Sequence, residues 1–279
     1  MFNIRKLFGV LFKSILIYFV ANILAVLLEL FLFEHILDID NYSMYFEYIS
    51  VHLIMFLIVL VFNLYDKKPI KENNYFLNFK IFSILTFIAI LLTFLIDYSM
   101  VLMRIYSIDF HIVNIFNFNY FIVIIIVLFS AFVEEYIFRK VLMIKLCTFN
   151  TNRTSIKIVG FSFALLHLLG SSYSSYIIFI VSFLYYYLIS ITLSHLLLIT
   201  KSFWGIVGFH FGHNIMVLSI SSYGISNSIY PFEWSNSTLR YSLGSNAGIL
   251  NLWNSMTSWI VILLLVNYLL DYLLKKMEL

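Results

Sequence analysis

Charged residues are scarce in this sequence. They make up 11% of its 279 residues, whereas soluble domains carry about 25%, so a soluble protein is excluded. The formal net charge of +3 is too small to indicate a nucleic-acid partner. The single cysteine, Cys147, excludes an internal disulfide and a cysteine-based metal cluster. Proline occurs only twice, and because proline interrupts helices, long and largely unbroken helices are expected.

Apolar residues make up 62% of the chain, and they gather in runs. A run of about 20 apolar residues crosses a bilayer as a helix, whose backbone is hydrogen-bonded internally. The expected fold class is therefore all-α, a polytopic membrane helical bundle of about eight transmembrane helices, with residues 1–279 forming a single integral-membrane domain. The approximate limits of the predicted spans are 7–33, 45–65, 77–96, 121–146, 156–169, 176–199, 203–221 and 252–274.

The basic residues predict how the chain is oriented. If eight spans alternate in direction, all of the 17 Lys and Arg residues except Arg104 and Arg240 fall on one side. Because Lys and Arg gather in cytoplasmic loops of membrane proteins, both termini are expected in the cytoplasm. The chain is accordingly predicted to be a multi-pass protein of a cell membrane.

Two adjacent carboxylates, Glu134 and Glu135, stand near the end of an apolar run. Each ionisable group costs roughly 2.5–3.5 kcal/mol at such a depth, so it usually has a function. Glu135 and Arg139 are spaced i, i+4 and can pair on one helix face, whereas Glu134 is turned about 100° away. This spacing suits Glu134 as a general base toward a water. The alternative is a buried Glu–Arg pair that only ties helices together.

Two later segments also bring polar side chains to membrane depth. Phe163 and His167 share one helix face, and His210 and Asn214 lie one turn apart on another helix. An amide beside an imidazole can donate hydrogen bonds to an oxyanion, although each pair taken singly also fits a packing role. The sequence contains no Gly-Xaa-Ser-Xaa-Gly elbow, His-Glu-Xaa-Xaa-His motif or phosphate-binding loop, which disfavours serine nucleophiles and zincin chemistry.

Taken in order, these signals resemble the motifs of a known family. Glu134-Glu135-Xaa-Xaa-Xaa-Arg139, Phe163-Xaa-Xaa-Xaa-His167 and His210-Xaa-Xaa-Xaa-Asn214 resemble the CPBP family of CAAX prenyl protease and bacteriocin-processing (Abi) intramembrane proteases. The resemblance covers about residues 121–218, the motif-bearing catalytic core. It implies an eight-span helical fold with a cavity that opens to the cytoplasm.

The resemblance also implies roles for individual residues. Glu134 would activate the hydrolytic water with His167, while His210 and Asn214 would stabilise the oxyanion and Glu135 and Arg139 would support the site. In an older interpretation, a divalent metal such as zinc is held by Glu134, His167 and His210. Some members have Asp at the position of Asn214, which weakens a metal-ligand role for that residue. Glutamate-activated attack by water without a metal is favoured, and zinc stays open as a cofactor.

The composition, rich in Phe and Asn, resembles that of chains from low-GC Gram-positive bacteria. Members of the family in such organisms are associated with peptide maturation and bacteriocin self-immunity. The sequence therefore predicts an intramembrane endopeptidase whose partners are a membrane-associated peptide and the lipid bilayer, with no nucleic acid and with the oligomeric state left open. One alternative is a non-catalytic immunity or scaffold protein that binds a bacteriocin or a membrane partner. A proton-coupled transporter is disfavoured because no inverted repeat is evident.

Overall fold

A computed structural model of the protein describes residues 75–102, 107–110, 118–169, 176–220, 232–235 and 247–277, together with the single positions 9, 16, 20, 53, 54 and 57. Apart from those single positions, the predicted spans 7–33 and 45–65 lie outside the described residues. The described helices are α3 (Tyr75–Leu102), α4 (Phe118–Glu135), η2 (Tyr136–Met143), α5 (Ile144–Cys147), α6 (Asn152–Leu169), α7 (Tyr176–Thr200), α8 (Phe203–Ile220) and α10 (Ala247–Met277).

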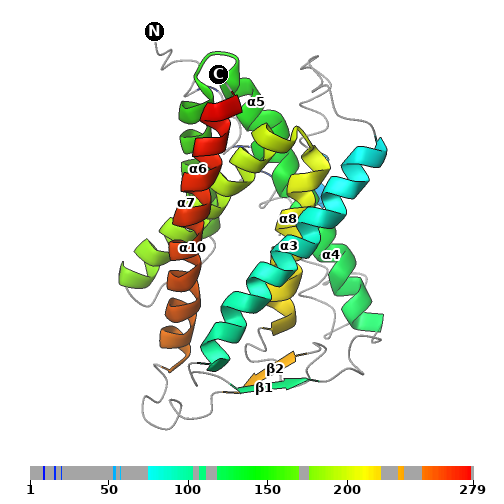
Figure 1. Ribbon diagram of the computed structural model, residues 1–279, viewed down its shortest axis with the longest axis vertical. Coiled ribbons are helices and arrows are strands. Elements are labelled where there is room, and N and C mark those ends of the chain that lie inside the picture. The colour runs from blue at the N-terminus through cyan, green and yellow to red at the C-terminus, as the bar shows by residue number, and fades with distance from the viewer. Residues whose placement is uncertain are drawn as a thin grey trace.

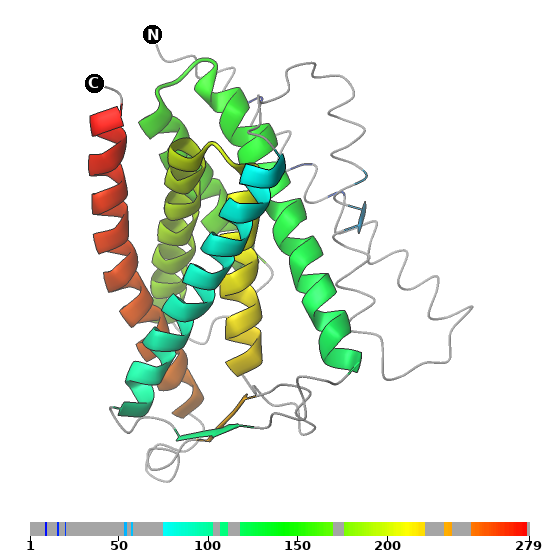
Figure 2. The same ribbon diagram turned by 45° about the vertical axis from the view of Figure 1, so that its right-hand side comes forward.

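The helices run up and down through one bundle. α3, α6 and α8 run in one direction, while α4, α7 and α10 run in the other (Figures 1 and 2). α7 packs between α6 and α10, and α8 packs between α3 and α4. The helices that begin at Tyr176 and Phe203 start where the apolar runs predicted them.

Close approach between α3 and α8 depends on glycine. A Cβ atom placed on Gly208 would lie 2.6 Å from the carbonyl oxygen of Phe82, and one on Gly212 would lie 2.5 Å from that of Thr86. Only a residue without a side chain allows this approach, as in other tightly packed membrane helices. The residue numbers rise together along the contact, so the two helices run in the same direction.

A small sheet closes one end of the bundle. Strand β1 (Ser107–Phe110) pairs antiparallel with β2 (Phe232–Ser235) at the end where α3 and α8 both finish (Figure 1). The described fold is helical apart from these two strands, which the all-α expectation did not include. Their pairing joins segments far apart in the sequence, so it depends on how α3 and α8 pack and leaves no local pattern in the chain.

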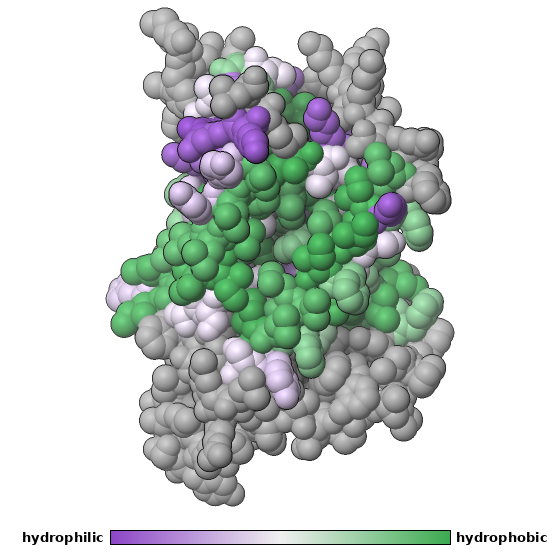
Figure 3. Space-filling model, in the orientation of Figure 1, coloured by the Kyte–Doolittle hydropathy of each residue, from purple (hydrophilic) through white to green (hydrophobic). Residues whose placement is uncertain are grey.

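Three of the described helices are long and apolar enough to cross a membrane. They are the stretch Leu77–Ile96 of α3, the whole of α7 and the stretch Met256–Lys276 of α10. The outer faces of these helices expose large apolar side chains, among them Phe79, Phe87, Leu265 and Tyr268. Figure 3 shows an apolar band across one face of the molecule, with hydrophilic residues gathered mainly toward the end at which α10 finishes. This pattern is the one expected of a surface that faces lipid.

Candidate active site

The first candidate motif lies where the helical winding changes. Glu134 and Glu135 are the last two residues of α4, and the chain continues without a break into the π-helix η2, which carries Arg139. π-helical turns are rare and occur frequently at functional sites. The wider winding begins between the carboxylates and the arginine, in a stretch whose apolar side chains contribute to the buried core.

Glu135 and Arg139 form a buried ion pair. Both side chains are 0% exposed, and the Arg139 Nε and Nη1 atoms lie 3.1 and 3.2 Å from the Glu135 Oε2 and Oε1 atoms. Nη2 of Arg139 donates to the carbonyl oxygen and the hydroxyl of Ser190 on α7, at 3.1 and 2.9 Å. The guanidinium also lies 5.0 Å above the Phe163 ring. The pairing predicted from the i, i+4 spacing is therefore present, and α6 and α7 enclose it.

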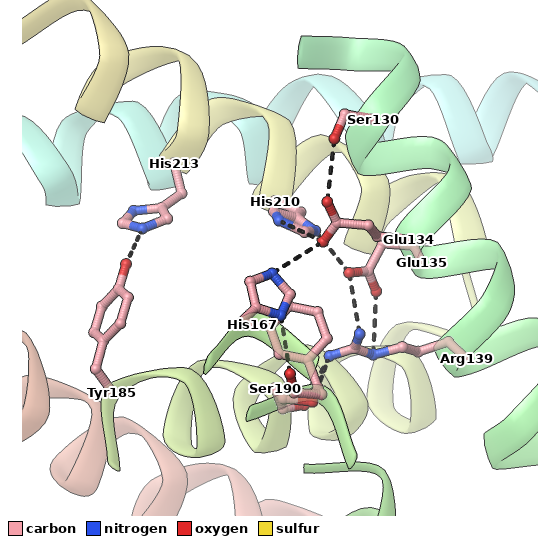
Figure 4. A network of polar contacts seen from close by, with 10 residues as sticks. Ser130, Glu134, Glu135, Arg139, His167, Tyr185, Ser190, His210 and His213 are labelled. Carbon is pink, nitrogen blue, oxygen red and sulfur yellow. Dashed lines mark hydrogen bonds and ion pairs between the residues drawn. The ribbon is translucent and has the colours of Figure 1, made fainter. Parts of the chain in front are cut away.

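Glu134 faces a different set of partners (Figure 4). Its side chain is 13% exposed, and its Oε2 atom lies 3.4 Å from His167 Nε2 and 3.9 Å from His210 Nε2. The hydroxyl of Ser130 donates to the other carboxylate oxygen, Oε1, at 3.1 Å. The two adjacent carboxylates are thus separated into one that pairs with arginine and one that meets two imidazoles.

α6 holds His167 in a defined tautomer. Its Nδ1 atom lies 2.9 Å from the carbonyl oxygen of Phe163, and because a carbonyl only accepts, Nδ1 carries the proton. Nε2 is then the atom that faces Glu134. The imidazole is stacked on the Phe163 ring at 4.0 Å between centroids and packs against the Tyr186 ring at 4.7 Å. The His167 side chain is 26% exposed, the most open of the site's histidines.

α8 brings His210 to both carboxylates. The helix follows a tight turn in which Lys201 has a φ of 51° and the Ser202 hydroxyl accepts a hydrogen bond from the Gly205 amide at 3.1 Å, as an N-terminal cap. His210 Nδ1 donates to Glu135 Oε1 at 2.7 Å, which leaves its Nε2 directed toward Glu134.

Five of the six predicted site residues are therefore brought together in one network: Glu134, Glu135, Arg139, His167 and His210. Asn214 follows His210 by one turn of α8 and is half-buried. Within the described part of the chain, no polar contact joins Asn214 to the other five.

The donors that the zinc hypothesis invokes are close to one another. They are Oε2 of Glu134 and the Nε2 atoms of His167 and His210. Among the residues that the structure describes, however, no group of three or more His, Cys, Asp or Glu side chains is arranged to hold a metal ion. No step of the mechanism proposed below passes through a metal.

Two residues of this network were not among the predicted ones. Ser130 carries a signal that could have identified it, because it lies four positions before Glu134 and so shares its helix face. Ser190 carries none: it meets Arg139 only because α7 packs against η2. A lone serine in an apolar helix cannot be distinguished from a packing residue by its sequence context.

A second polar network lies beside the first and involves His213. The Tyr185 hydroxyl donates to His213 Nε2, and His213 Nδ1 donates to Thr93 Oγ1 at 3.1 Å, since the Thr93 proton is given to the Ala89 carbonyl oxygen at 2.7 Å. The Trp259 ring packs edge-on against the imidazole. Figure 4 shows this pair apart from the carboxylates. It links α3, α7, α8 and α10.

Fold and site together define a helical membrane protein with a buried glutamate–arginine–histidine centre. Residues 116–216 match the family model described as Type II CAAX prenyl endopeptidase Rce1-like. This segment contains all six predicted site residues, and the match supports assignment to the CAAX protease family that the three motifs resemble. The family is one of proteases, so the match supports a peptidase. No curated protein and no solved structure matches the chain.

Proposed function

We propose that the protein is an intramembrane endopeptidase that hydrolyses a peptide bond of a membrane-associated peptide or protein. The observation that carries this proposal is the placement of two acceptors, Glu134 Oε2 and His167 Nε2, 3.4 Å apart, on side chains that are 13% and 26% exposed in an otherwise buried cluster. A water that lies within hydrogen-bond distance of both atoms, about 2.8 Å, can donate one hydrogen to each. Its oxygen lone pair is then free to attack a carbonyl carbon.

In the proposed reaction Glu134 is the general base. It takes a proton from the water as the new C–O bond forms, and it returns that proton to the nitrogen as the C–N bond breaks. His167 accepts the second hydrogen bond of the water, since its Nδ1 proton is committed to the Phe163 carbonyl oxygen. The products are a carboxylic acid and an amine, so no further reactant is required.

His210 serves as the donor to the oxyanion. Its Nδ1 proton is directed at Glu135, so its Nε2 atom donates only when the ring carries a second proton. Two carboxylates and one guanidinium leave one negative charge in the cluster, and that proton balances it. A donor preorganised beside the developing charge stabilises the tetrahedral intermediate. By resemblance to the family, the Asn214 amide is the second donor, and Glu135 and Arg139 support the site.

The proposed topology is that of a multi-pass protein of a bacterial cell membrane, with about eight spans and both termini in the cytoplasm. The basic residues of the described helices support it, because Lys145, Arg153, Lys201, Lys275 and Lys276 all lie near helix ends on the same side of the bundle.

Single cysteines placed at residues 38 and 68, in a Cys147→Ser background, are expected to react with an impermeant thiol reagent from opposite sides of the membrane. Labelling from the same side would contradict the proposed topology.

The proposed substrate is a peptide with a membrane-associated segment, and the proposed roles in the cell are peptide maturation or bacteriocin self-immunity. The test uses the full chain in lipid vesicles with a quenched-fluorescent library of peptides that carry an apolar segment. Wild-type protein is expected to cleave at least one peptide. His167→Ala is expected to lower kcat by about 100-fold or more, the usual contribution of a group that assists proton transfer.

His195 provides a matched control for His167. It is also a histidine on a long helix, although more buried, and its Nδ1 atom bonds to Asn267 on α10 at 3.2 Å. His195→Gln is expected to cleave at nearly the wild-type rate. Full activity of His167→Ala would contradict its proposed role, and loss of activity on chelation with recovery on adding zinc would overturn the metal-free mechanism. A different result would favour the alternative. If the wild-type protein cleaves no peptide, and cells that carry the Glu134→Ala variant keep their full immunity to the bacteriocin, the protein is a binding protein instead.

A further inference from the structure

We propose that Ser130 is a positioning residue for hydrolysis: its hydroxyl holds one oxygen of Glu134 and so presents the other oxygen to His167 and His210. The inference rests on the proposed function, because it requires Glu134 to activate a water. Ser130 lies outside the three motifs. It stands one helical turn before Glu134 on α4 and is 0% exposed.

The hydrogen bond of Ser130 differs from the usual one in a helix. Helical serines commonly donate to the backbone carbonyl four residues earlier, as Ser162 on α6 does to the Ile158 carbonyl oxygen at 2.9 Å. Ser130 Oγ donates to a side-chain oxygen, Oε1 of Glu134, at 3.1 Å. Since an ionised carboxylate only accepts, the hydroxyl proton points at Glu134.

Holding one carboxylate oxygen orients the other. The terminal side-chain torsion of a glutamate has a broad and roughly twofold distribution. A carboxylate without such a partner therefore samples several orientations. When Oε1 of Glu134 accepts the hydrogen bond from Ser130, the other oxygen, Oε2, lies 3.4 Å from His167 Nε2 and 3.9 Å from His210 Nε2. Figure 4 shows Ser130 and the imidazoles on opposite sides of the carboxylate. This is the geometry in which a water between Glu134 and His167 has both of its acceptors in place.

The experiment measures kcat and KM of Ser130→Ala in vesicles, with the library peptide that wild type cleaves fastest. kcat is expected to fall between about 10-fold and 100-fold, since misplacing a reacting group by about 1 Å costs up to that much. KM is expected to stay unchanged, because Ser130 acts through Glu134. Ser130→Thr keeps a hydroxyl and is expected to restore most of kcat. Ser162→Ala, which removes another buried hydroxyl from α6, is expected to leave both constants near wild type.

A kcat for Ser130→Ala equal to that of wild type would overturn the proposal, and so would an equal loss in Ser162→Ala. If Ser130→Ala does not fold, Ser130→Cys replaces it: the thiol is similar in size and a weaker donor, so its kcat is expected below that of wild type, and a wild-type value would overturn the proposal. In both cases cleavage by wild type, and its loss in Glu134→Gln, leave the proposed function intact. If wild type cleaves nothing, the proposed function fails and the role of Ser130 fails with it.

Discussion

Glu134→Gln is expected to abolish peptide hydrolysis while leaving the protein at least as stable as wild type. Glutamine has the shape of glutamate and its oxygen can still accept the Ser130 hydrogen bond, but it cannot take a proton from water. The expected loss in kcat is about 1,000-fold, within the range that general-base catalysis contributes. The measurement is the rate of cleavage of a library peptide by purified protein in vesicles.

The stability of the same variant separates a catalytic role from a structural one. Charges at membrane depth are costly, and Glu134 brings two of them to the site: its own carboxylate, beside the neutral pair of Glu135 and Arg139, and the second proton of His210 that balances this carboxylate. Removing it is therefore expected to raise the unfolding temperature in detergent or leave it unchanged. Loss of activity together with equal or greater stability is the pattern of a site residue.

Glu134→Asp is the matched variant. It keeps the carboxylate but moves it away from the two imidazoles by about one methylene, so it is expected to retain part of the activity that Glu134→Gln loses. A Glu134→Gln protein that cleaves the peptide at the wild-type rate would contradict the proposed reaction. A variant that loses both activity and stability would instead favour the interpretation in which the carboxylates only tie helices together.

The sequence predicted those parts of the site that lie on one helix. The spacing of Glu135 and Arg139 is enough to predict their pairing, because residues four apart share a helix face whatever the helix packs against. The same rule separates Glu134 from Glu135 by direction. Helical spacing alone could not predict that His167 and His210 lie beside Glu134. The order of the motifs and their resemblance to a family supplied that expectation, whereas the hydrogen bond of His210 to Glu135 was not predicted.

The residues that escaped prediction are those whose role depends on packing. Ser190 and Thr93 are small polar residues in apolar helices, and nothing near them in the sequence reveals that one accepts from Arg139 and the other from His213. The paired strands β1 and β2 form because α3 and α8 run side by side in the same direction. That contact in turn depends on glycines such as Gly212, whose spacing indicates a close neighbour without indicating which helix it is.

Arg139→Met is expected to be the most destabilising single substitution in the site. Both side chains of the Glu135–Arg139 pair are 0% exposed, so methionine in place of arginine leaves a carboxylate buried without its main counter-charge. Breaking a buried pair in this way costs roughly 3–5 kcal/mol. The contacts to Ser190 and to the face of Phe163 are lost as well. The measurement is the unfolding temperature of the purified protein, with the yield of folded protein as a second readout.

Lys140→Met is the matched control, because it removes a positive charge from the adjacent position. The Lys140 amino group lies 5.0 Å from the centre of the Phe203 ring and 5.7 Å from that of Tyr136, and a cation over aromatic rings at a partly exposed site contributes about 0.5–1 kcal/mol. The loss expected for Lys140→Met is therefore several-fold smaller than for Arg139→Met.

The double variant Glu135→Gln with Arg139→Met tests the reason for this difference. If the main cost of Arg139→Met is the buried charge of Glu135, neutralising that charge is expected to recover part of the lost stability, so the two substitutions together cost less than the sum of each alone. His210 still finds an acceptor in the glutamine oxygen, which limits the change to the ion pair. Simple additivity would instead assign the loss to packing around Phe163 and Ser190, and the buried charge would then have little part in holding η2 against α6 and α7.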